Sequence, residues 1–494
     1  MKLLSRKSSV GGDAIYLTLS RVAVALIGLV TSMLLARFRT LDEYGTYSQI
    51  IMVTDLVSTI LTLGLPNSIN YFLAKAESKE EKQRFMSIYV TLSTLLTVII
   101  GVCLICSMPL IIDYFDNPAI TAFAYVFAVY PWSSIMINSL GNICIVYGKA
   151  NRLILYNVVH AITILLILLL TKALGMTFRQ YMTIYMAIML LFAVFALGWI
   201  TKMVGAVKPL LSSKMIKEIF IFSIPMGLAS VVGTLNAELD KLVIGRFFTT
   251  EQYAIFANAA KELPVTMLAA SLTAVLLPRV VRLLRDDRRE DVVCIWGCAA
   301  NISFCFMLLI VGGFIVFAPD IMSLFYSQKY VTSGGVAVFR IYAVILVFRS
   351  IYWGLVLNAS GKTNFIFISS ILTLIFNFIC NIVFCQVIGF IGPAIATLAV
   401  TCIMNFIQLL FTNKILKISV SKLLPWRKIF GLICETAVFG AVFWYVRYGI
   451  LEPFHFENQI FISIVLGGIW GILYGLVNVK FIKRNWIKMN KIES

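Results

Sequence analysis

Long apolar stretches alternate with short polar segments along the whole of this 494-residue chain. Each stretch holds about 20 predominantly apolar residues, which at about 1.5 Å per residue is enough to cross a hydrocarbon core of about 30 Å. The pattern predicts an all-α polytopic membrane protein with about 14 transmembrane helices. The approximate spans are 14–36, 46–73, 86–112, 119–147, 153–171, 181–203, 218–245, 253–278, 292–318, 335–359, 365–387, 390–412, 429–449 and 458–479.

The composition agrees with this prediction. Sixty per cent of the residues are hydrophobic, 13% are charged and the mean hydropathy is +0.94. An average soluble domain is about a quarter charged. The first span follows the basic segment MKLLSRK but contains Arg21 and is too long for the core of a signal peptide. We therefore expect it to stay attached and the spans to leave no soluble domain of any size.

The net charge of +18 is explained by membrane topology and does not indicate a nucleic-acid partner. Most of the 41 lysines and arginines lie in alternate connections if the N-terminus is cytosolic. This is the positive-inside distribution of multi-pass membrane proteins. It predicts a multi-pass protein of the cell membrane with both termini in the cytosol.

The chain also repeats itself, because three landmarks recur in the same order at offsets between 209 and 213. An even number of spans separates equivalent landmarks, so the halves are parallel and related by an axis along the membrane normal. The predicted domains are a six-helix lobe over 1–205, a second over 206–416, and two extra helices with a basic cytosolic tail over 417–494. The matched stretches are 34–47 with 243–256, Leu65-Pro66 with Leu277-Pro278, and 148–151 with 361–364.

The sequence Gly361-Lys362-Thr363 could suggest a phosphate-binding loop, but Val356 stands where that loop needs its first glycine. The equivalent Gly148-Lys149-Ala150 of the other repeat has no hydroxyl residue at all. Both segments are interpreted as turns in which Gly ends one helix in a left-handed conformation and the following Asn, Asn151 or Asn364, caps the next. No ATP site is predicted.

Each repeat begins a helix with a capping box, at Thr40 with Glu43 and at Thr249 with Gln252. The prolines 66, 131, 225 and 264 lie within apolar spans, where they are expected to kink helices.

No cofactor, metal site or catalytic constellation is predicted. All ten cysteines lie in or at the edge of apolar spans, and the chain has only two histidines. Buried small side chains explain these cysteines better than metal ligands do. The chain is therefore not expected to be an enzyme.

Charged residues within the spans are the candidate functional residues, because a charge in hydrocarbon is costly unless it faces protein or water. Asp55, alone on its helix, is the first candidate for a proton or sodium site, while Glu238 and Lys241 at i and i+3 could simply pair with each other. Arg340 and Glu435 lie near helix ends and are expected to snorkel. The cationic candidates for substrate binding are Arg21, Lys241, Lys261 and Arg349. The acidic candidates for ion coupling are Asp55, Glu238, Asp240 and Glu262.

The segments LLARFRTLDEYGTYSQ and LTLGLPNSINYF in the first half, with LNASGKTNFIFISSILTLIFNFICNIVF and IGFIGPAIATLAV in the second, carry a family resemblance. They resemble the Wzx-type polysaccharide flippases of the multidrug/oligosaccharidyl-lipid/polysaccharide exporter superfamily. The resemblance implies a transporter that flips undecaprenyl-pyrophosphate-linked oligosaccharide from the cytosolic to the periplasmic leaflet by alternating access. It implies a role in cell-surface polysaccharide biosynthesis such as O-antigen, with a polysaccharide polymerase and ligase as partners beside membrane lipids.

A diphosphate cargo needs a cationic path, and the resemblance assigns that role here to Arg21, Lys241, Lys261 and Arg349. A multidrug extruder of the same superfamily is the alternative, but a cavity for organic cations should be acidic or aromatic. An integral-membrane polysaccharide polymerase or ligase is a further alternative. It would need a substantial outer segment, whereas the longest outer connection is PDIMSLFYSQKYVTSG.

Overall fold

The computed structural model describes residues 10–261, 266–452 and 459–492, with the side chains of 10–21 and most of 266–274 left aside. Every regular element in these ranges is a helix, as predicted. The long helices are α1 (Val10–Phe38), α2 (Leu41–Thr62), α4 (Lys79–Cys106), α6 (Ala124–Val146), α7 (Ala150–Ala173), α8 (Phe178–Val204), α9 (Ser213–Phe247), α11 (Thr266–Arg285), α12 (Arg289–Val316), α14 (Ser333–Phe348), α16 (Thr363–Ile388), α17 (Gly392–Leu416), α19 (Trp426–Trp444) and α20 (Gln459–Lys491). The short ones are α3 (Ser68–Lys75), α5 (Met108–Phe115), α10 (Thr250–Ala259), α13 (Ala318–Tyr326), α15 (Leu355–Ala359) and α18 (Val420–Leu423).

The helices of the described chain are consistent with about 14 spans. Ten are long and apolar enough to cross a membrane, and α2 with the segment Leu65–Lys75 forms one further span bent by 58°. Two shorter apolar helices, Val22–Phe38 and Ser333–Phe348, correspond to the first and tenth predicted spans. The remaining predicted span, 253–278, is divided between α10 and α11 around residues 262–265, which lie outside the described part.

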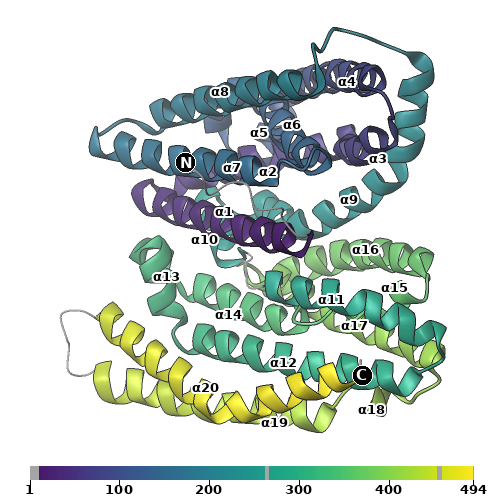
Figure 1. The fold of residues 1–494 in the computed structure, drawn as a ribbon. Coiled ribbons are helices and arrows are strands. Elements are labelled where there is room, and N and C mark those ends of the chain that lie inside the picture. The colour runs from purple at the N-terminus through teal and green to yellow at the C-terminus, as the bar shows by residue number, and fades with distance from the viewer. Residues whose placement is uncertain (1–9, 262–265, 453–458, 493–494) are drawn as a thin grey trace, which may run out of the picture. The chain divides into compact units, whose positions relative to one another are not determined.

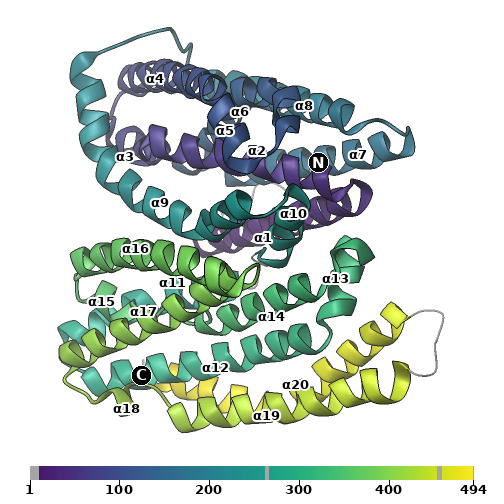
Figure 2. The same cartoon turned by 180° about the vertical axis from the view of Figure 1, so that it is seen from behind.

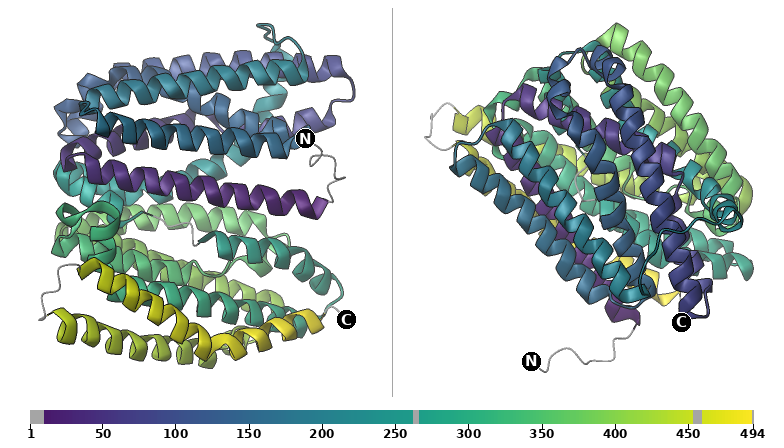
Figure 3. Two further views of the ribbon diagram at one scale, coloured as in Figure 1. Left: turned by 60° about the vertical axis from the view of Figure 1, so that its left-hand side comes forward. Right: turned by 90° about the horizontal axis from the view of Figure 1, so that it is seen from above.

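The chain forms two compact units, one of residues Met1–Glu238 with Gly245–Ala254 and the other of Leu239–Ile244 with Ile255–Ser494. In the first unit α8 packs against α6, α6 against α4, and α7 lies along α1 (Figure 3). Buried aromatic and aliphatic side chains of α4, α6 and α8, among them Phe85 and Tyr89, form its core. The six-helix lobes expected from the sequence repeat stay a prediction.

In the second unit α12 is the central helix. The last two long helices, α19 and α20, pack against it, and α14 packs against both α12 and α17 (Figure 1). The helices α16 and α17 form an antiparallel pair, seen from behind in Figure 2. Most of α12 is buried, including Trp296 at 1% exposure, because neighbours surround it on several sides.

The two glycine turns have the same geometry, as the repeat predicts. Gly148 has φ of +62° and Gly361 has φ of +73°. In each case the next residue's N–H reaches back five residues, Lys149 to the Cys144 carbonyl at 2.8 Å and Lys362 to the Leu357 carbonyl at 3.0 Å. This bond completes a Schellman motif, which satisfies carbonyls at the end of the incoming helix. Gly361 therefore belongs to a turn.

The expectation that asparagine caps the outgoing helices is wrong. The N-cap positions of α7 and α16 are Lys149 and Lys362, and neither makes a side-chain cap bond. Asn151 and Asn364 lie one residue inside the first turn of their helices, too far along the chain to be the capping residue. The capping boxes are confirmed: Thr40 and Glu43 exchange both bonds, at 3.1 Å each, and Thr249 pairs with Gln252 in the same way.

The second span breaks where the sequence places Leu63-Gly64-Leu65-Pro66. Leu63 and Gly64 both have positive φ, and Pro66 lies in the 3₁₀ turn Leu65–Asn67 that starts the next segment. A Cβ on Gly64 would lie only 2.7 Å from the Cα of Gly227 on α9, so close helix approach adds a second requirement for glycine. Pro131 and Pro225 lie inside α6 and α9, and Pro264 lies outside the described residues.

The parallel repeat makes a prediction about sidedness. Cysteines introduced at Lys149 and Glu251, in a background without the ten native cysteines, should react with a membrane-impermeant maleimide from opposite sides of the membrane. Right-side-out cells should label only the Glu251→Cys variant, and inverted vesicles only Lys149→Cys. Labelling of both from one side would contradict the parallel arrangement.

Candidate functional site

Two predicted cations of the second unit border one small pocket beside an interrupted span. Lys261 lies just after α10, and Arg349 lies just after α14. The aromatic side chains of Phe314, Phe339 and Tyr342 line much of the remaining wall. Both cations are half-buried, so they lie between solvent-accessible space and the apolar packing of the unit.

The position of Arg349 follows from the way its span is interrupted. The helix α14 ends at Phe348, and helical structure resumes only at Leu355. The Phe348 carbonyl accepts bonds from Trp353 Nε1 at 2.6 Å and Asn405 Nδ2 at 3.1 Å. These side chains thus satisfy a backbone carbonyl that the interrupted helix leaves without a partner. A helix break at membrane depth requires such partners because no water is available there. Arg349 occupies the C-cap of α14, where a positive charge is favoured by the helix dipole.

The segment Leu239–Ile244 of α9 adds two more charges to this region of the second unit. Asp240 is 4% exposed and close enough to Arg349 for the two charges to attract each other. Lys241, the next residue, is close enough to Lys261 for the two ammonium groups to repel each other. Three of the four cationic candidates therefore lie together with one acid. We call Lys241, Lys261, Arg349 and Asp240 the cationic cluster.

Two candidates lie outside what the structure describes. Arg21 lies on the part of α1, residues 10–21, for which the structure describes only the backbone. Glu262 lies in the segment 262–265, outside the described residues. Their roles stay predictions from the sequence.

The remaining acidic candidates lie in the first unit. Asp55 on α2 is exposed, although it lies 14 residues into its helix. The sequence suggested that Asp55 stands alone, but the structure gives it two neighbours. The Tyr130 hydroxyl of α6 donates a hydrogen bond to the Asp55 carboxyl, and Glu238 of α9 is close enough to repel it. Two neighbouring carboxylates are suited to share a proton or a small cation.

Tyrosines lie close to Asp55, and the sequence pattern did not predict them. Tyr47 and Tyr185 contact each other edge to face, with ring centroids 6.4 Å apart, and Tyr185 stacks on Tyr181 at 6.1 Å. These residues come from α2 and α8, more than a hundred positions apart. Only the spacing of Tyr47 and Asp55, about two helical turns on one helix, is visible in the sequence.

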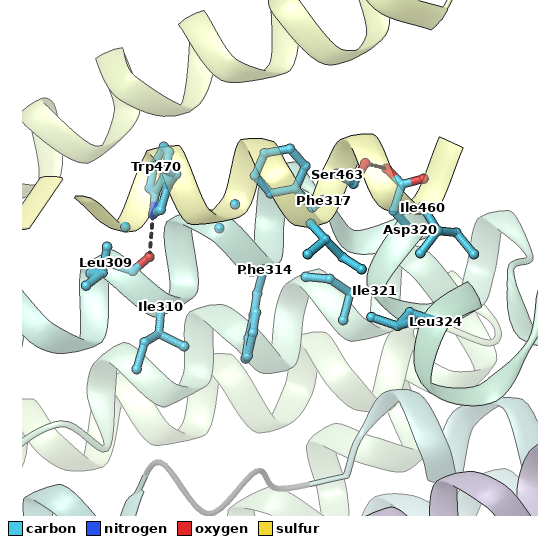
Figure 4. Close-up of a pocket in the computed structure, with 14 residues that line it drawn as sticks. Leu309, Ile310, Phe314, Phe317, Asp320, Ile321, Leu324, Ile460, Ser463 and Trp470 are labelled. Atoms are coloured by element: carbon cyan, nitrogen blue, oxygen red, sulfur yellow. Dashed lines mark hydrogen bonds between the residues drawn. The ribbon is translucent and has the colours of Figure 1, made fainter. Parts of the chain in front are cut away.

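A second structural feature lies near the ends of α12 and α20. A mainly apolar groove of about 320 Å³ lies between them, lined by residues such as Phe314, Ile321 and Ile464. Trp470 Nε1 donates to the Leu309 carbonyl at 2.8 Å at one end, and Ser463 bonds to Asp320 at the other (Figure 4).

Asp320 is also the acceptor of a buried ion pair that sequence reasoning missed. Arg447 Nη2 lies 2.8 Å from Asp320 Oδ1, and the two side chains are 4% and 13% exposed. Ser463 donates to Asp320 Oδ2 at 2.7 Å and accepts from Arg447 Nε at 2.7 Å, while Tyr448 donates to Oδ2 at 3.1 Å. Arg447 lies in a π-helical segment, Tyr445–Leu451, that follows α19. The network joins α13, this segment and α20.

Comparison with known proteins identifies the family. The family model described as "Polysaccharide biosynthesis protein" matches residues 10–284, more than half of the chain. The chain belongs to the polysaccharide biosynthesis protein family. A curated relative, "Capsular polysaccharide biosynthesis protein CapF" of Staphylococcus aureus, is 24% identical over 149 residues. That match spans 30% of this chain and 38% of the length of CapF.

Solved structures show the fold of this polysaccharide biosynthesis protein. "Lipid II flippase MurJ, inward closed conformation" superposes with a TM-score of 0.71 at 19% identity, over 95% of this chain and 100% of the other. An inward-facing multidrug resistance MATE family transporter of the MOP superfamily gives a TM-score of 0.62 at 16% identity, over 81% and 99%. The family and the fold inferred from the sequence motifs are confirmed.

The Arg447–Asp320 pair of this polysaccharide biosynthesis protein yields a stability prediction. Arg447→Met leaves the Asp320 carboxylate buried without its partner, which should cost about 3–5 kcal/mol of stability. The double variant Arg447→Met/Asp320→Leu removes both charges and should recover most of that loss. Size-exclusion chromatography after heating, in detergent, measures the effect as a shift in the temperature of aggregation. An unchanged profile for Arg447→Met would show that the ion pair contributes nothing.

Proposed function

We propose that this protein flips a lipid-linked oligosaccharide with a phosphate or diphosphate linkage across the membrane. The cationic cluster carries the proposal, because it places three cations against one acid beside an interrupted span. An anionic headgroup crossing a membrane needs such a path, and arginine suits phosphate because its planar fork makes two parallel bonds. The family description and the flippase fold of MurJ support the same cargo class.

The proposal extends to direction and setting. The cargo moves from the cytosolic to the periplasmic leaflet of a bacterial inner membrane, as an undecaprenyl-pyrophosphate-linked repeat unit. Both termini lie in the cytosol, and the product is passed to a polysaccharide polymerase and ligase. Two compact units are suited to alternating access, since that mechanism moves one rigid bundle against another.

The net positive charge of the cationic cluster disfavours a multidrug extruder. Organic cations would be repelled by Lys241, Lys261 and Arg349, which outnumber Asp240. The Asp55–Glu238 pair supplies the acidic groups that ion coupling needs, in the other unit. The anion-binding and cation-coupling roles are thereby assigned to different residues.

Arg349 provides the sharpest test of the cargo site. Arg349→Ala should reduce surface polysaccharide roughly tenfold to a hundredfold, since charge-assisted bonds contribute about 1.5–3 kcal/mol. The single change also leaves Asp240 without its cation, so protein loss could imitate loss of transport. Arg349→Gln/Asp240→Asn removes both charges and should keep the protein in the membrane while transport stays low. Quantitative membrane blots beside polysaccharide gels separate these effects.

The control is Arg340→Lys on α14, the helix that ends just before Arg349. The Arg340 guanidinium donates to the Ile315 carbonyl at 3.0 Å and lies outside the cationic cluster. It should leave polysaccharide normal, whereas Arg349→Lys should restore transport only partly because the planar fork is lost. Normal polysaccharide from the well-expressed Arg349→Gln/Asp240→Asn variant would remove the cluster from the cargo path.

Asp55 is proposed as the coupling residue. Asp55→Asn keeps the side-chain volume and the bond from Tyr130 but cannot gain or lose a proton. Transport in reconstituted vesicles should then become independent of an imposed proton or sodium gradient. Glu435→Gln, a membrane carboxylate held by Asn478 at 2.6 Å, is the matched control and should keep the dependence. Full gradient dependence in Asp55→Asn would exclude this role.

A further inference from the structure

A wide groove lies between α7 and α8 in the first unit, and none of its lining residues belongs to the cationic cluster or to the Asp55–Glu238 pair. Its volume is about 1090 Å³, at the upper end of the range of small-molecule sites. Apolar side chains form most of its wall, including Leu155, Leu191 and Phe195, which are 62–65% exposed. Two basic residues, Arg152 and Lys202, complete the lining.

Both basic residues lie at one end of the groove. Arg152 is near the start of α7 and Lys202 near the end of α8. The two helices are joined by the short connection 174–177 and run antiparallel, so the start of one lies beside the end of the other. Both side chains are exposed, and within the described residues neither has an acidic partner. This end adjoins the Gly148 turn, which the positive-inside distribution assigns to the cytosol.

The wall near the basic end is preorganised by aromatic contacts. Tyr156 donates its hydroxyl proton to the Phe192 carbonyl at 2.9 Å and so bridges from α7 to α8. Its ring stacks on Phe195 with centroids 6.1 Å apart, and Trp199 lies at 6.1 Å on the same side. These contacts join the two walls of the groove, and its aromatic rings lie just beyond the two cations, as at a membrane interface.

We propose that this groove binds an anionic phospholipid of the cytosolic leaflet. The headgroup phosphate lies between Arg152 and Lys202, and an acyl chain runs along Leu155, Leu191 and Phe195. An acyl chain gains little by leaving bulk lipid for an apolar groove, since the two surroundings are equally apolar. Selection must therefore come from the headgroup, and paired basic residues at the cytosolic end of a helix pair select negative charge.

Trp199 provides the signal for a test. The full-length protein is reconstituted into phosphatidylcholine vesicles containing increasing fractions of brominated phosphatidylglycerol or brominated phosphatidylcholine. Because the chain has eight tryptophans, the Trp199 signal is obtained by subtracting the fluorescence of the Trp199→Phe variant from that of the parent protein. Half-maximal quenching should occur at a roughly thirtyfold lower mole fraction of the anionic lipid, as two basic contacts would give.

Two charge variants separate a built site from general attraction. Arg152→Gln/Lys202→Gln should abolish the preference for the brominated anionic lipid. Lys172→Gln/Arg179→Gln removes the same charge from the opposite ends of the same two helices. This variant should preserve the preference for the brominated anionic lipid. Circular dichroism of each variant confirms that the helices remain.

Three results would overturn the proposal. The first is equal quenching of Trp199 by the two brominated lipids in the parent protein. The second is a preference that persists in Arg152→Gln/Lys202→Gln. The third is displacement of brominated phosphatidylglycerol by an equimolar polyprenyl phosphate, which would make the groove a cargo site.

Discussion

Backbone hydrogen bonding at membrane depth is the constraint on which this structure depends. No water is available there, so each backbone N–H and C=O must find a partner inside the chain, and helices are the solution. Two interruptions within the described residues show how the constraint is met where a helix ends inside a span. At Gly64 the chain turns into a 3₁₀ segment pressed against Gly227, and at Phe348 a released carbonyl is bonded by Trp353 and Asn405. The second interruption also fixes the place of Arg349.

Charges within the spans obey a related rule, because Arg349, Arg447 and Asp55 each have a polar or charged neighbour. Arg349 is close to Asp240, Arg447 bonds Asp320, and Asp55 bonds Tyr130. These environments differ in what they allow. The Arg447–Asp320 network is largely buried, and Asp320 also accepts bonds from Ser463 and Tyr448, which suits a structural joint. The cationic cluster holds more cations than acids, and its members Lys261 and Arg349 border a small pocket, in keeping with the proposed binding of an anionic cargo.

The sequence was sufficient for features that depend on local rules. Apolar spans, the paired Schellman turns at Gly148 and Gly361, and the capping boxes at Thr40 and Thr249 each involve residues a few positions apart. Side-chain partners across helices could not be predicted in this way. Tyr130 beside Asp55 and Asp320 beside Arg447 depend on how distant helices pack and rotate. The prediction of asparagine caps was wrong because the Schellman motif places the helix N-cap at the preceding lysine. Asn151 and Asn364 therefore lie inside the first turn.

The proposed function, moving a lipid-linked oligosaccharide across a bilayer without altering its bonds, can be measured directly. The direct measurement uses purified protein in vesicles that carry a polyprenyl-diphosphate oligosaccharide with a fluorescent sugar. Dithionite added outside bleaches only the label in the outer leaflet. The protein should make the protected inner-leaflet label accessible, while mass spectrometry should find the lipid unchanged. Label that stays protected in vesicles containing folded protein, or a lipid that is cleaved or extended, would contradict it.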